Sequence, residues 1–225
     1  MNATVNENCI GCGRCVEACL FDALTLYGQE MTVEAVLAEV LRDRVFYAES
    51  GGGVTVSGGE PLLHPEFCAE LFEPLNAEKI PCAVDTCGEV PWKAFKTVLP
   101  HTGLFLYDIK AMDSDLHRRL TGRGNERILE NLRTLDETGV PIEIRMPVVP
   151  GLNDSPEEFA AAGRFLAGLR HLVGVRLLAY HAFARSKYES VGHTVTLPDV
   201  PSPSPEHRET LAKILTGFGV NVLEK

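Results

Sequence analysis

Short, nearly continuous apolar runs alternate with helical patterns along most of this chain of 225 residues. Each run is long enough for one strand, and nearly continuous apolar strands are typical of parallel sheets. Because a helix that joins two parallel strands makes a right-handed crossover, the repeated βα units predict an α/β fold built as a barrel or partial barrel. The expected strands cover residues 53–56, 82–85, 104–108, 142–145 with 147–149, and 175–180.

Helical patterns fill the intervals between these runs. Six apolar residues from Val33 to Val45 lie on one stripe, and Thr32 is the expected N-cap of that helix. Ser155-Pro156 and Ser204-Pro205 each place a capping residue before a proline at the first helical position. The remaining helical patterns cover residues 65–75, 95–99, 125–135, 159–169 and 206–218.

Four of the seven cysteines are packed into residues 9–19 with the spacing C-x2-C-x2-C-x3-C. Thiolates this close in sequence can converge on a 4Fe-4S cluster, and Gly11 and Gly13 let backbone N–H groups turn toward cluster sulfurs. Zinc is the alternative metal, but zinc sites normally pair two separated C-x2-C knuckles and no second knuckle is present. The expected cluster ligands are Cys9, Cys12, Cys15 and Cys19, whereas Cys68, Cys82 and Cys87 are expected to be buried apolar groups.

These two patterns divide the chain. Residues 1–30 are predicted to form a small ferredoxin-like 4Fe-4S module, and residues 31–225 a partial (β/α) barrel of parallel strands. The net charge of −10 argues against a nucleic acid or an anionic membrane surface as a partner. The first eight residues lack the apolar stretch of a signal peptide, and no later run approaches a membrane span, so a cytoplasmic location is expected.

Polar or small residues follow every expected strand at its carboxyl end. In parallel sheets and barrels this edge binds ligands, because the βα loops gather there. Adjacent glycines let backbone groups approach a ligand closely, and a neighbouring carboxylate can meet a ligand amine. Taken singly, these residues also suit turns, solvated ion pairs or loop positions; taken together they predict one site. The candidates are Gly58, Gly59, Glu60, Asp85, Asp108, Lys110, Arg145 and His181.

Six segments in unbroken order resemble the glycyl-radical enzyme activating enzymes, which are radical S-adenosylmethionine (SAM) proteins of the pyruvate formate-lyase activase type. The cysteine run at residues 9–19 is similar to the ferredoxin-like insertion of members that activate other enzymes. The six segments are Ser57-Gly58-Gly59-Glu60-Pro61, Asp85-Thr86-Cys87-Gly88, Tyr107-Asp108-Ile109-Lys110, Leu120-Thr121-Gly122 with Asn125, Arg145-Met146-Pro147-Val148-Val149-Pro150-Gly151, and Tyr180-His181.

The resemblance implies a reaction and its cofactors. In this family a 4Fe-4S cluster with one open iron chelates SAM, and one electron cleaves it to methionine and a 5′-deoxyadenosyl radical. The radical then takes a hydrogen from a glycine Cα of a partner, the glycyl-radical enzyme, and a flavodoxin or ferredoxin-type protein is the implied reductant. By resemblance, Gly58, Gly59 and Glu60 hold the methionine amine, Asp85 and Asp108 help bind a monovalent cation near the cofactor carboxylate, and Lys110, Arg145 and His181 contact the cofactor.

One departure from the family pattern concerns the cluster that holds SAM. The family carries C-x3-C-x2-C in the loop after the first barrel strand, and here the cysteine that would follow Cys15 and Cys19 is Asp22. No first βα unit precedes the helix expected from Thr32. The sequence is therefore interpreted as a family member without its N-terminal segment, inactive as given. The alternatives are a non-catalytic iron–sulfur electron-transfer protein and a cofactor-binding remnant without chemistry.

Overall fold

The computed structural model describes residues 9–26, 28–183, 185–190 and 194–223 and separates into two compact units. The smaller unit contains the chain up to Thr32 together with His181–Pro201, and the larger unit contains Val33–Tyr180 and the residues from Ser202 onward. Residues 1–8 and 27 of the predicted module lie outside the described residues. The larger unit holds the entire sheet, and each unit is treated by itself below.

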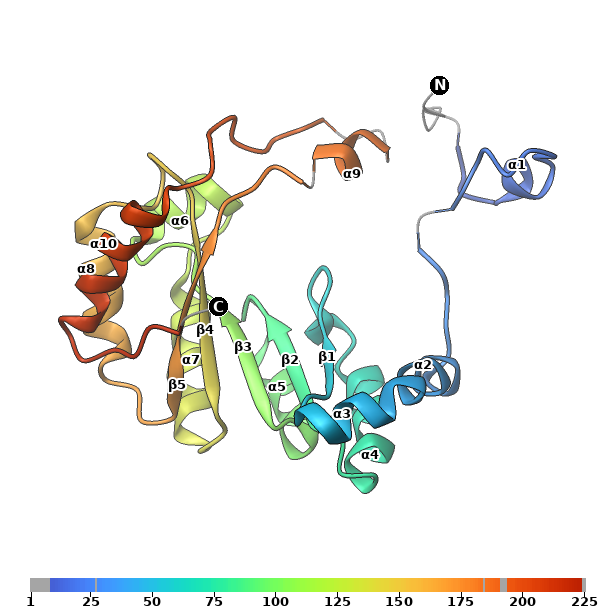
Figure 1. Ribbon diagram of the computed structural model, residues 1–225, viewed down its shortest axis with the longest axis horizontal. Coiled ribbons are helices and arrows are strands. Elements are labelled where there is room, and N and C mark those ends of the chain that lie inside the picture. The colour runs from blue at the N-terminus through green and yellow to red at the C-terminus, as the bar shows by residue number, and fades with distance from the viewer. Residues whose placement is uncertain (1–8, 27, 184, 191–193, 224–225) are drawn as a thin grey trace. The chain divides into compact units, whose positions relative to one another are not determined.

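The sheet consists of five strands that are all parallel and adjacent in chain order (Figure 1). This arrangement confirms the predicted α/β fold of the partial-barrel type. Among the described residues, the first strand pairs on one side only, and the last strand makes one further bridge, between Val175 and Val222. The strands are β1 (Val54–Val56), β2 (Cys82–Thr86), β3 (Leu104–Asp108), β4 (Ile142–Val148) and β5 (Leu172–Ala179).

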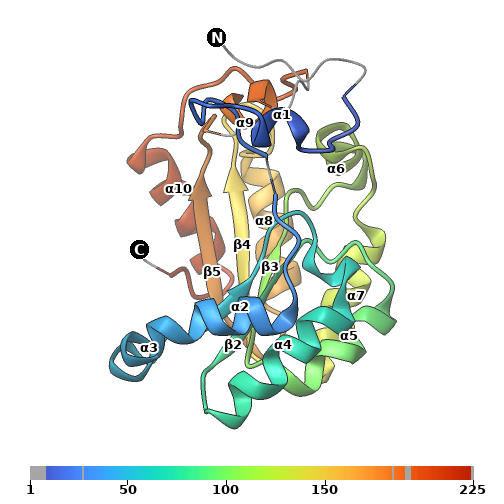
Figure 2. The same ribbon diagram turned by 90° about the vertical axis from the view of Figure 1, so that its right-hand side faces the viewer.

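Helices follow the strands as predicted, and Figure 2 shows several of them along one side of the sheet. None of the described helices is long and apolar enough to cross a bilayer. The helices are α1 (Arg14–Glu17), α2 (Val33–Val40), α3 (Arg44–Ser50), α4 (Pro65–Ala77), α5 (Trp92–Val98), α6 (Ser114–Thr121), α7 (Glu126–Glu137), α8 (Pro156–Leu166), α9 (Arg185–Ser190) and α10 (Pro205–Thr216), with 3₁₀ turns η1 (Leu41–Asp43), η2 (Pro61–Leu63) and η3 (Leu99–His101).

The helix expected from Val33 to Val45 is a single element in the sequence pattern but three in the structure. α2 ends at Val40, η1 tightens the next turn, and α3 begins at Arg44. The stripe packs against the core as far as Leu41, whereas the side chain of Val45 is 65% exposed. The tighter 3₁₀ turn changes the angular period, and that change turns Val45 away from the stripe.

The two faces of the sheet differ in chemistry. Alternate strand residues such as Val84, Phe105 and Ile144 are completely buried in the core. The intervening residues include Asp85 and Arg145, which are only half-buried. Nearly continuous apolar strands were expected, and β2 and β4 depart from this pattern because their second face carries Asp85 and Arg145 of the candidate site.

Candidate functional site

The loop after β1 places a glycine pair and a carboxylate at the carboxyl end of the sheet. Gly58 has φ = +128°, a backbone conformation that residues with a side chain rarely adopt. A Cβ on Gly58 or Gly59 would meet no atom within 4 Å, so conformation rather than crowding requires glycine at position 58. The open space leaves the backbone of both glycines exposed, and their role in holding a ligand stays a prediction.

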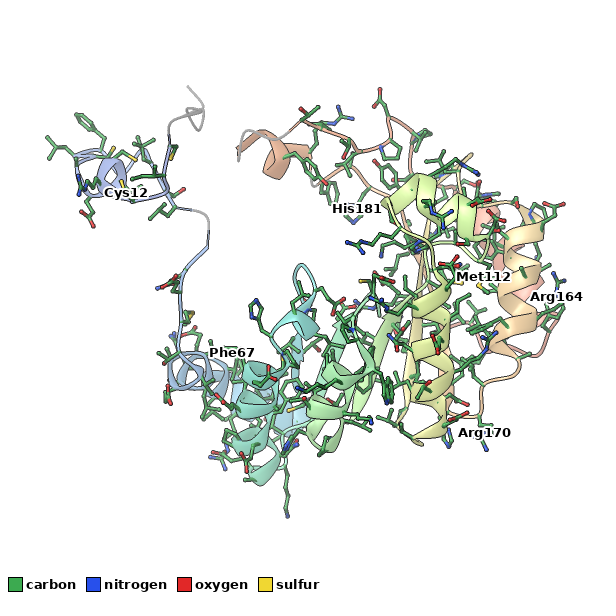
Figure 3. The ribbon with its side chains drawn as sticks, turned by 180° about the vertical axis from the view of Figure 1, so that it is seen from behind. Cys12, Phe67, Met112, Arg164, Arg170 and His181 are labelled. Carbon is green, nitrogen blue, oxygen red and sulfur yellow. The ribbon has the colours of Figure 1, made fainter. Side chains whose placement is uncertain are left out.

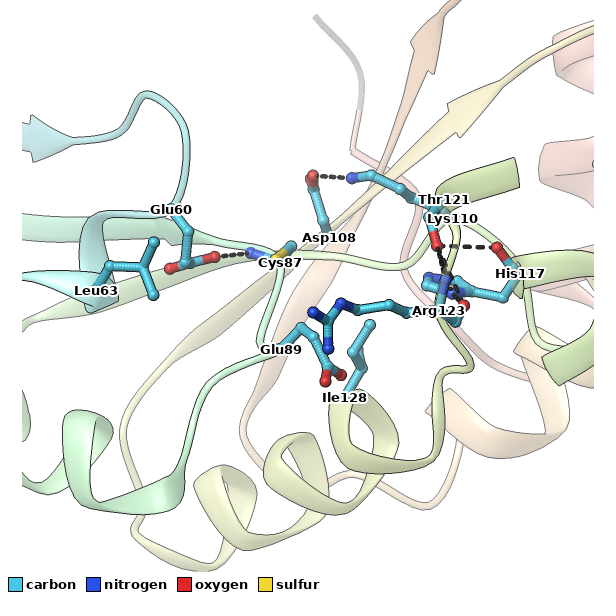
Figure 4. Close-up of a pocket in the computed structure, with 10 residues that line it drawn as sticks. All are labelled: Glu60, Leu63, Cys87, Glu89, Asp108, Lys110, His117, Thr121, Arg123 and Ile128. Atoms are coloured by element: carbon cyan, nitrogen blue, oxygen red, sulfur yellow. Dashed lines mark hydrogen bonds and ion pairs between the residues drawn. The ribbon is translucent and has the colours of Figure 1, made fainter. Parts of the chain in front are cut away.

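The carboxylate of Glu60 joins this loop to the loop that follows β2 (Figure 4). Its Oε1 accepts hydrogen bonds from the N–H of Leu62 (3.1 Å) and the hydroxyl of Thr86 (2.8 Å), and its Oε2 accepts from the N–H of Cys87 (2.9 Å). Thr86 is buried and itself accepts from the N–H of Gly88. The Cys87 thiol also bonds to this carboxylate, so a ligand ammonium at Glu60 would share its oxygens with these donors or displace the thiol.

Two ion pairs lie side by side across β2, β3 and β4. Arg145 Nη1 is 2.7 Å from Asp85 Oδ2, and Lys110 Nζ is 2.5 Å from Asp108 Oδ2. Asp108 and Arg145 are register partners on neighbouring strands, so the four charges form one cluster. Burial raises the pKa of the Asp85 carboxyl, and the Arg145 guanidinium partly offsets that effect.

Arg145 retains unused hydrogen-bonding capacity. Its Nε is buried and has no hydrogen-bond partner among the described residues. A buried donor of this kind carries a desolvation cost that an acceptor on a bound ligand would remove. The cluster of Glu60 and the two ion pairs therefore presents both signs of charge, which suits a zwitterionic ligand.

A cavity of about 330 Å³ opens beside this cluster (Figure 4). Three predicted site residues line it, namely Glu60, Asp108 and Lys110, whereas Gly58, Gly59, Asp85 and Arg145 are not part of its wall. The other lining residues are not among the predicted site residues, although Cys87 and Thr121 lie within segments quoted for the resemblance. These other residues are Leu63, Cys87, Glu89, His117, Thr121, Arg123 and Ile128. Cys87 was expected to be a buried apolar group, and this expectation is wrong, because Cys87 is only partly buried and lines the cavity.

His117 is the least expected member of the cavity wall. It lies on α6, is buried, and its Nδ1 is 2.7 Å from the carbonyl oxygen of Arg123. The hydroxyl of Thr121 donates to the His117 carbonyl (2.9 Å). These contacts hold the end of α6 and the following turn together, and both contribute lining residues to the cavity. The sequence signals that mark this helix are the N-cap Asp113 and the left-handed Gly122 after its last turn.

The last predicted residue of the site, His181, falls in the smaller unit. Its ring stacks on Phe183 with the ring centroids 4.3 Å apart. The structure thus brings together Glu60, Asp85, Asp108, Lys110 and Arg145 within the larger unit, while the role of His181 stays a prediction.

The four cysteines of the N-terminal run belong to the smaller unit, where Figure 3 shows Cys12 in a loop next to α1. Gly11 and Gly13 both have positive φ, a backbone conformation that glycine adopts without steric cost. The N–H of Ala23 donates to Cys19 Sγ (3.2 Å), and backbone N–H groups of Phe21 and Ala23 lower the pKa of the Cys19 thiol. N–H donors to sulfur favour a thiolate.

The donor set of this run fits a four-thiolate cluster in kind. The side chains do not converge, since no three His, Cys, Asp or Glu residues in the described part of the chain are grouped to hold a metal ion. Cys68 and Cys82 are buried in the core, and burial raises the pKa of each to about 11. Both remain neutral thiols at physiological pH, which favours their predicted role as apolar core groups.

Comparison with known proteins connects this geometry to a family. The model of the radical SAM superfamily matches residues 6–162. The isethionate sulfite-lyase activating enzyme of Desulfovibrio desulfuricans is 43% identical over 86% of this chain and 63% of its own length. The pyruvate formate-lyase-activating enzyme of Clostridium pasteurianum is 36% identical over 84% of this chain and 79% of its own length.

A solved structure agrees with these two relatives. A domain of a pyruvate-formate lyase-activating enzyme from Bacteroides vulgatus is 34% identical, superposes with a TM-score of 0.65, and is matched over 77% of this chain and 98% of that domain. The chain spans 61–63% of the length of three isethionate sulfite-lyase activating enzymes that it matches.

Proposed function

Because this chain belongs to the radical SAM superfamily, we propose that it binds SAM at the mouth of its sheet as part of a glycyl-radical enzyme activating enzyme. The observation that carries the proposal is the charge cluster of Glu60 with the pairs Asp85–Arg145 and Asp108–Lys110. SAM is a zwitterion with an added sulfonium, and this cluster offers carboxylates for its cations and cations for its carboxylate. Relatives named as activating enzymes support the class of reaction.

In this proposal, different residues of the chain contact different parts of SAM. The carboxylate of Glu60 and the backbone of Gly58 and Gly59 receive the methionine amine. Lys110 and the unpartnered Nε of Arg145 face the methionine carboxylate, and Asp85 with Asp108 holds a monovalent cation beside it. His181 contacts the rest of the cofactor from the segment after β5. A reduced 4Fe-4S cluster, when bound, supplies the electron that starts radical chemistry on SAM.

The cysteine run receives a separate role in this proposal. Cys9, Cys12, Cys15 and Cys19 hold one 4Fe-4S cluster that passes electrons from a flavodoxin or ferredoxin-type reductant. The substrate of the complete reaction is a glycine in a partner glycyl-radical enzyme, and the proposed location is the cytoplasm, without nucleic acid or membrane as a partner. In this division residues 1–30 form the electron-transfer module and residues 31–225 form the cofactor-binding partial barrel.

A second candidate function is electron transfer alone, without SAM chemistry. The observation that favours it is that four of the seven cysteines of this sequence, enough thiolates for one cluster, lie in a single run at residues 9–19. Binding of SAM separates the two candidates, because an electron-transfer protein has no need of the charge cluster at the mouth of the sheet.

Replacing Glu60 with glutamine is expected to weaken SAM binding by about 1.5 to 3 kcal/mol, because one charge-assisted contact with the ligand amine is lost. The measurement is calorimetric titration of SAM into the parent chain and into Glu60→Gln. The matched control is Glu73→Gln, which removes the same charge from an exposed position near the far end of α4. Equal affinity of the parent and Glu60→Gln would reject the assignment of Glu60.

Thr86 provides a test of whether the orientation of Glu60 matters as well as its charge. Thr86→Val keeps the carboxylate but removes the hydroxyl that donates to it, and a loss of about 1 kcal/mol of SAM binding is expected. Thr86→Ser retains the hydroxyl and is expected to bind like the parent. If Thr86→Val binds SAM as tightly as Thr86→Ser, the hydroxyl does not orient Glu60.

A further inference from the structure

A buried asparagine connects the ends of two strands that carry the proposed cofactor cations. Asn153 is 6% exposed and lies in the loop after β4. Its Nδ2 donates to the carbonyl oxygens of Lys110 (2.8 Å) and Pro147 (2.7 Å), and its Oδ1 accepts from the N–H of Val149 (2.8 Å). Three bonds of good length to backbone groups hold this side chain in a single orientation.

The position of these bonds relative to the strand ladder gives them a function. Directly after β3, the backbone N–H of Ile109 donates to the carbonyl oxygen of Arg145 on β4 (2.9 Å). This bond continues the β3–β4 ladder by one residue beyond the pair of Asp108 and Arg145. Two residues after Arg145, Pro147 has no N–H to donate, and Lys110 lies in the loop after β3, one residue beyond Ile109. The side chain of Asn153 bonds to Lys110 and to Pro147, so it joins the two segments where the backbone hydrogen bonds between β3 and β4 stop.

Two other buried asparagines hold loops at the same edge, but with different partners. Asn125 donates to the carbonyl oxygens of Ala111 (2.9 Å) and Met112 (2.8 Å), and Asn131 donates to those of Gly88 and Val90 (both 2.8 Å). Each of these two residues ties one loop to the region of α7. Asn153 differs because it joins the backbone of Lys110 to the end of the strand that carries Arg145.

We infer that Asn153 is a positioning residue that fixes the separation of Lys110 from Arg145, so that both cations meet the carboxylate end of bound SAM. The inference rests on the proposed function of the site. The physical reason is that each cation is already paired, Lys110 with Asp108 and Arg145 with Asp85, and a ligand carboxylate must be received between two groups that cannot swing freely. A shift of the Lys110 backbone would misplace one of them.

The variant that tests this inference is Asn153→Ala, which removes all three bonds without adding a charge. We expect the dissociation constant for SAM to rise about tenfold, because Lys110 is no longer held for its charge-assisted contact. In the background Lys110→Met the same Asn153→Ala change is expected to leave the dissociation constant unaltered, since the residue through which it acts is absent. The matched control is Asn221→Ala, which removes an asparagine bond to the carbonyl oxygen of Val173 (3.0 Å). Val173 lies near the amino end of β5, at the edge of the sheet opposite to the candidate site.

The double-variant comparison separates positioning from a general loss of stability. A purely structural role would lower the melting temperature and weaken SAM binding equally in the parent and Lys110→Met backgrounds, and that result would overturn the inference. Unchanged affinity of Asn153→Ala in the parent background would overturn it as well.

A second measurement decides the inference even if the proposed function fails. With lysine ammonium groups labelled by ¹³C-methylation, the NMR resonance of Lys110 is assigned from its absence in Lys110→Arg and compared in the parent, Asn153→Ala and Asn221→Ala. We expect Asn153→Ala alone to shift this resonance toward those of exposed lysines, because the ion pair with Asp108 loosens. If the parent binds no SAM, the proposed function is rejected, and the Lys110 resonance alone then decides: an unchanged resonance in Asn153→Ala would overturn the inference.

Discussion

Replacing Cys12 with alanine is expected to reduce the iron bound by the anaerobically reconstituted protein from about four atoms per chain to nearly none. The run supplies four thiolates for one cluster, and its side chains are largely exposed, so the surrounding chain offers little other support for a cluster that has lost one ligand. Iron and acid-labile sulfide analysis, together with the absorption spectrum of the reconstituted protein, measures the outcome.

The control for this experiment is Cys87→Ala, which removes a cysteine from the larger unit. Burial, reinforced by the neighbouring Glu60, raises the pKa of Cys87 to about 11, so it is a poor thiolate ligand and its loss is expected to leave iron unchanged. Near-stoichiometric zinc without sulfide in the parent protein would show that the run is a zinc site. Iron loss in Cys87→Ala would show that the cluster draws on the larger unit.

Most of the fold was predictable because strand signals are local. The short apolar runs at residues 82–85 and 104–108 place β2 and β3 within one residue of the structure. The start of β5 was missed because the segment from Leu172 contains Gly174, which weakens a strand pattern. α6 was missed because its sequence from Ser114 to Thr121 is mostly polar, and its ends are set by single capping residues rather than by an apolar stripe.

The site was predictable as a set of residues but not as a set of contacts. Strand ends mark which side chains reach the mouth of the sheet, so Asp85, Asp108 and Arg145 were found in this way. Their pairing depends on register: Asp85 and Arg145 are 60 residues apart and meet only because β3 lies between their strands. The bonds from Thr86 and Cys87 to Glu60 likewise follow from the adjacency of two loops, which no local pattern encodes.

The asparagine contacts illustrate the same limit for loops. Asn153 reaches the backbone of Lys110 across 43 residues of sequence, and Asn131 reaches Gly88 across the same distance. A buried asparagine that bonds to backbone carbonyl groups looks like any loop asparagine in the sequence, because its partners carry no side-chain signature. The role of such a residue depends on the folded positions of the carbonyl groups at the strand ends, which need a hydrogen-bond donor once they are buried.

The second large effect concerns the reaction itself. The 225-residue protein, carrying its four-cysteine cluster and reduced with dithionite, is expected to release no 5′-deoxyadenosine from SAM. A cluster held by four thiolates has every iron ligated, and the family reaction requires an iron with an open position. The remaining cysteines do not form a substitute site, since Cys68 and Cys82 are buried thiols and no triad of possible ligands is grouped in the described part of the chain.

The matching experiment adds a cluster site with an open iron and leaves the residues at the carboxyl end of the sheet unchanged. The same 225 residues, preceded by a β-strand and a C-x3-C-x2-C loop, are expected to form 5′-deoxyadenosine, because β1 has an edge that is unpaired among the described residues and can receive a parallel strand beside Glu60. Glu60→Gln in the extended protein is expected to reduce the yield, whereas Glu73→Gln is expected not to. Repeated turnover by the unextended protein, abolished by Glu60→Gln, would contradict this prediction. It would mean that the 225 residues hold a cluster with an open iron without a C-x3-C-x2-C loop.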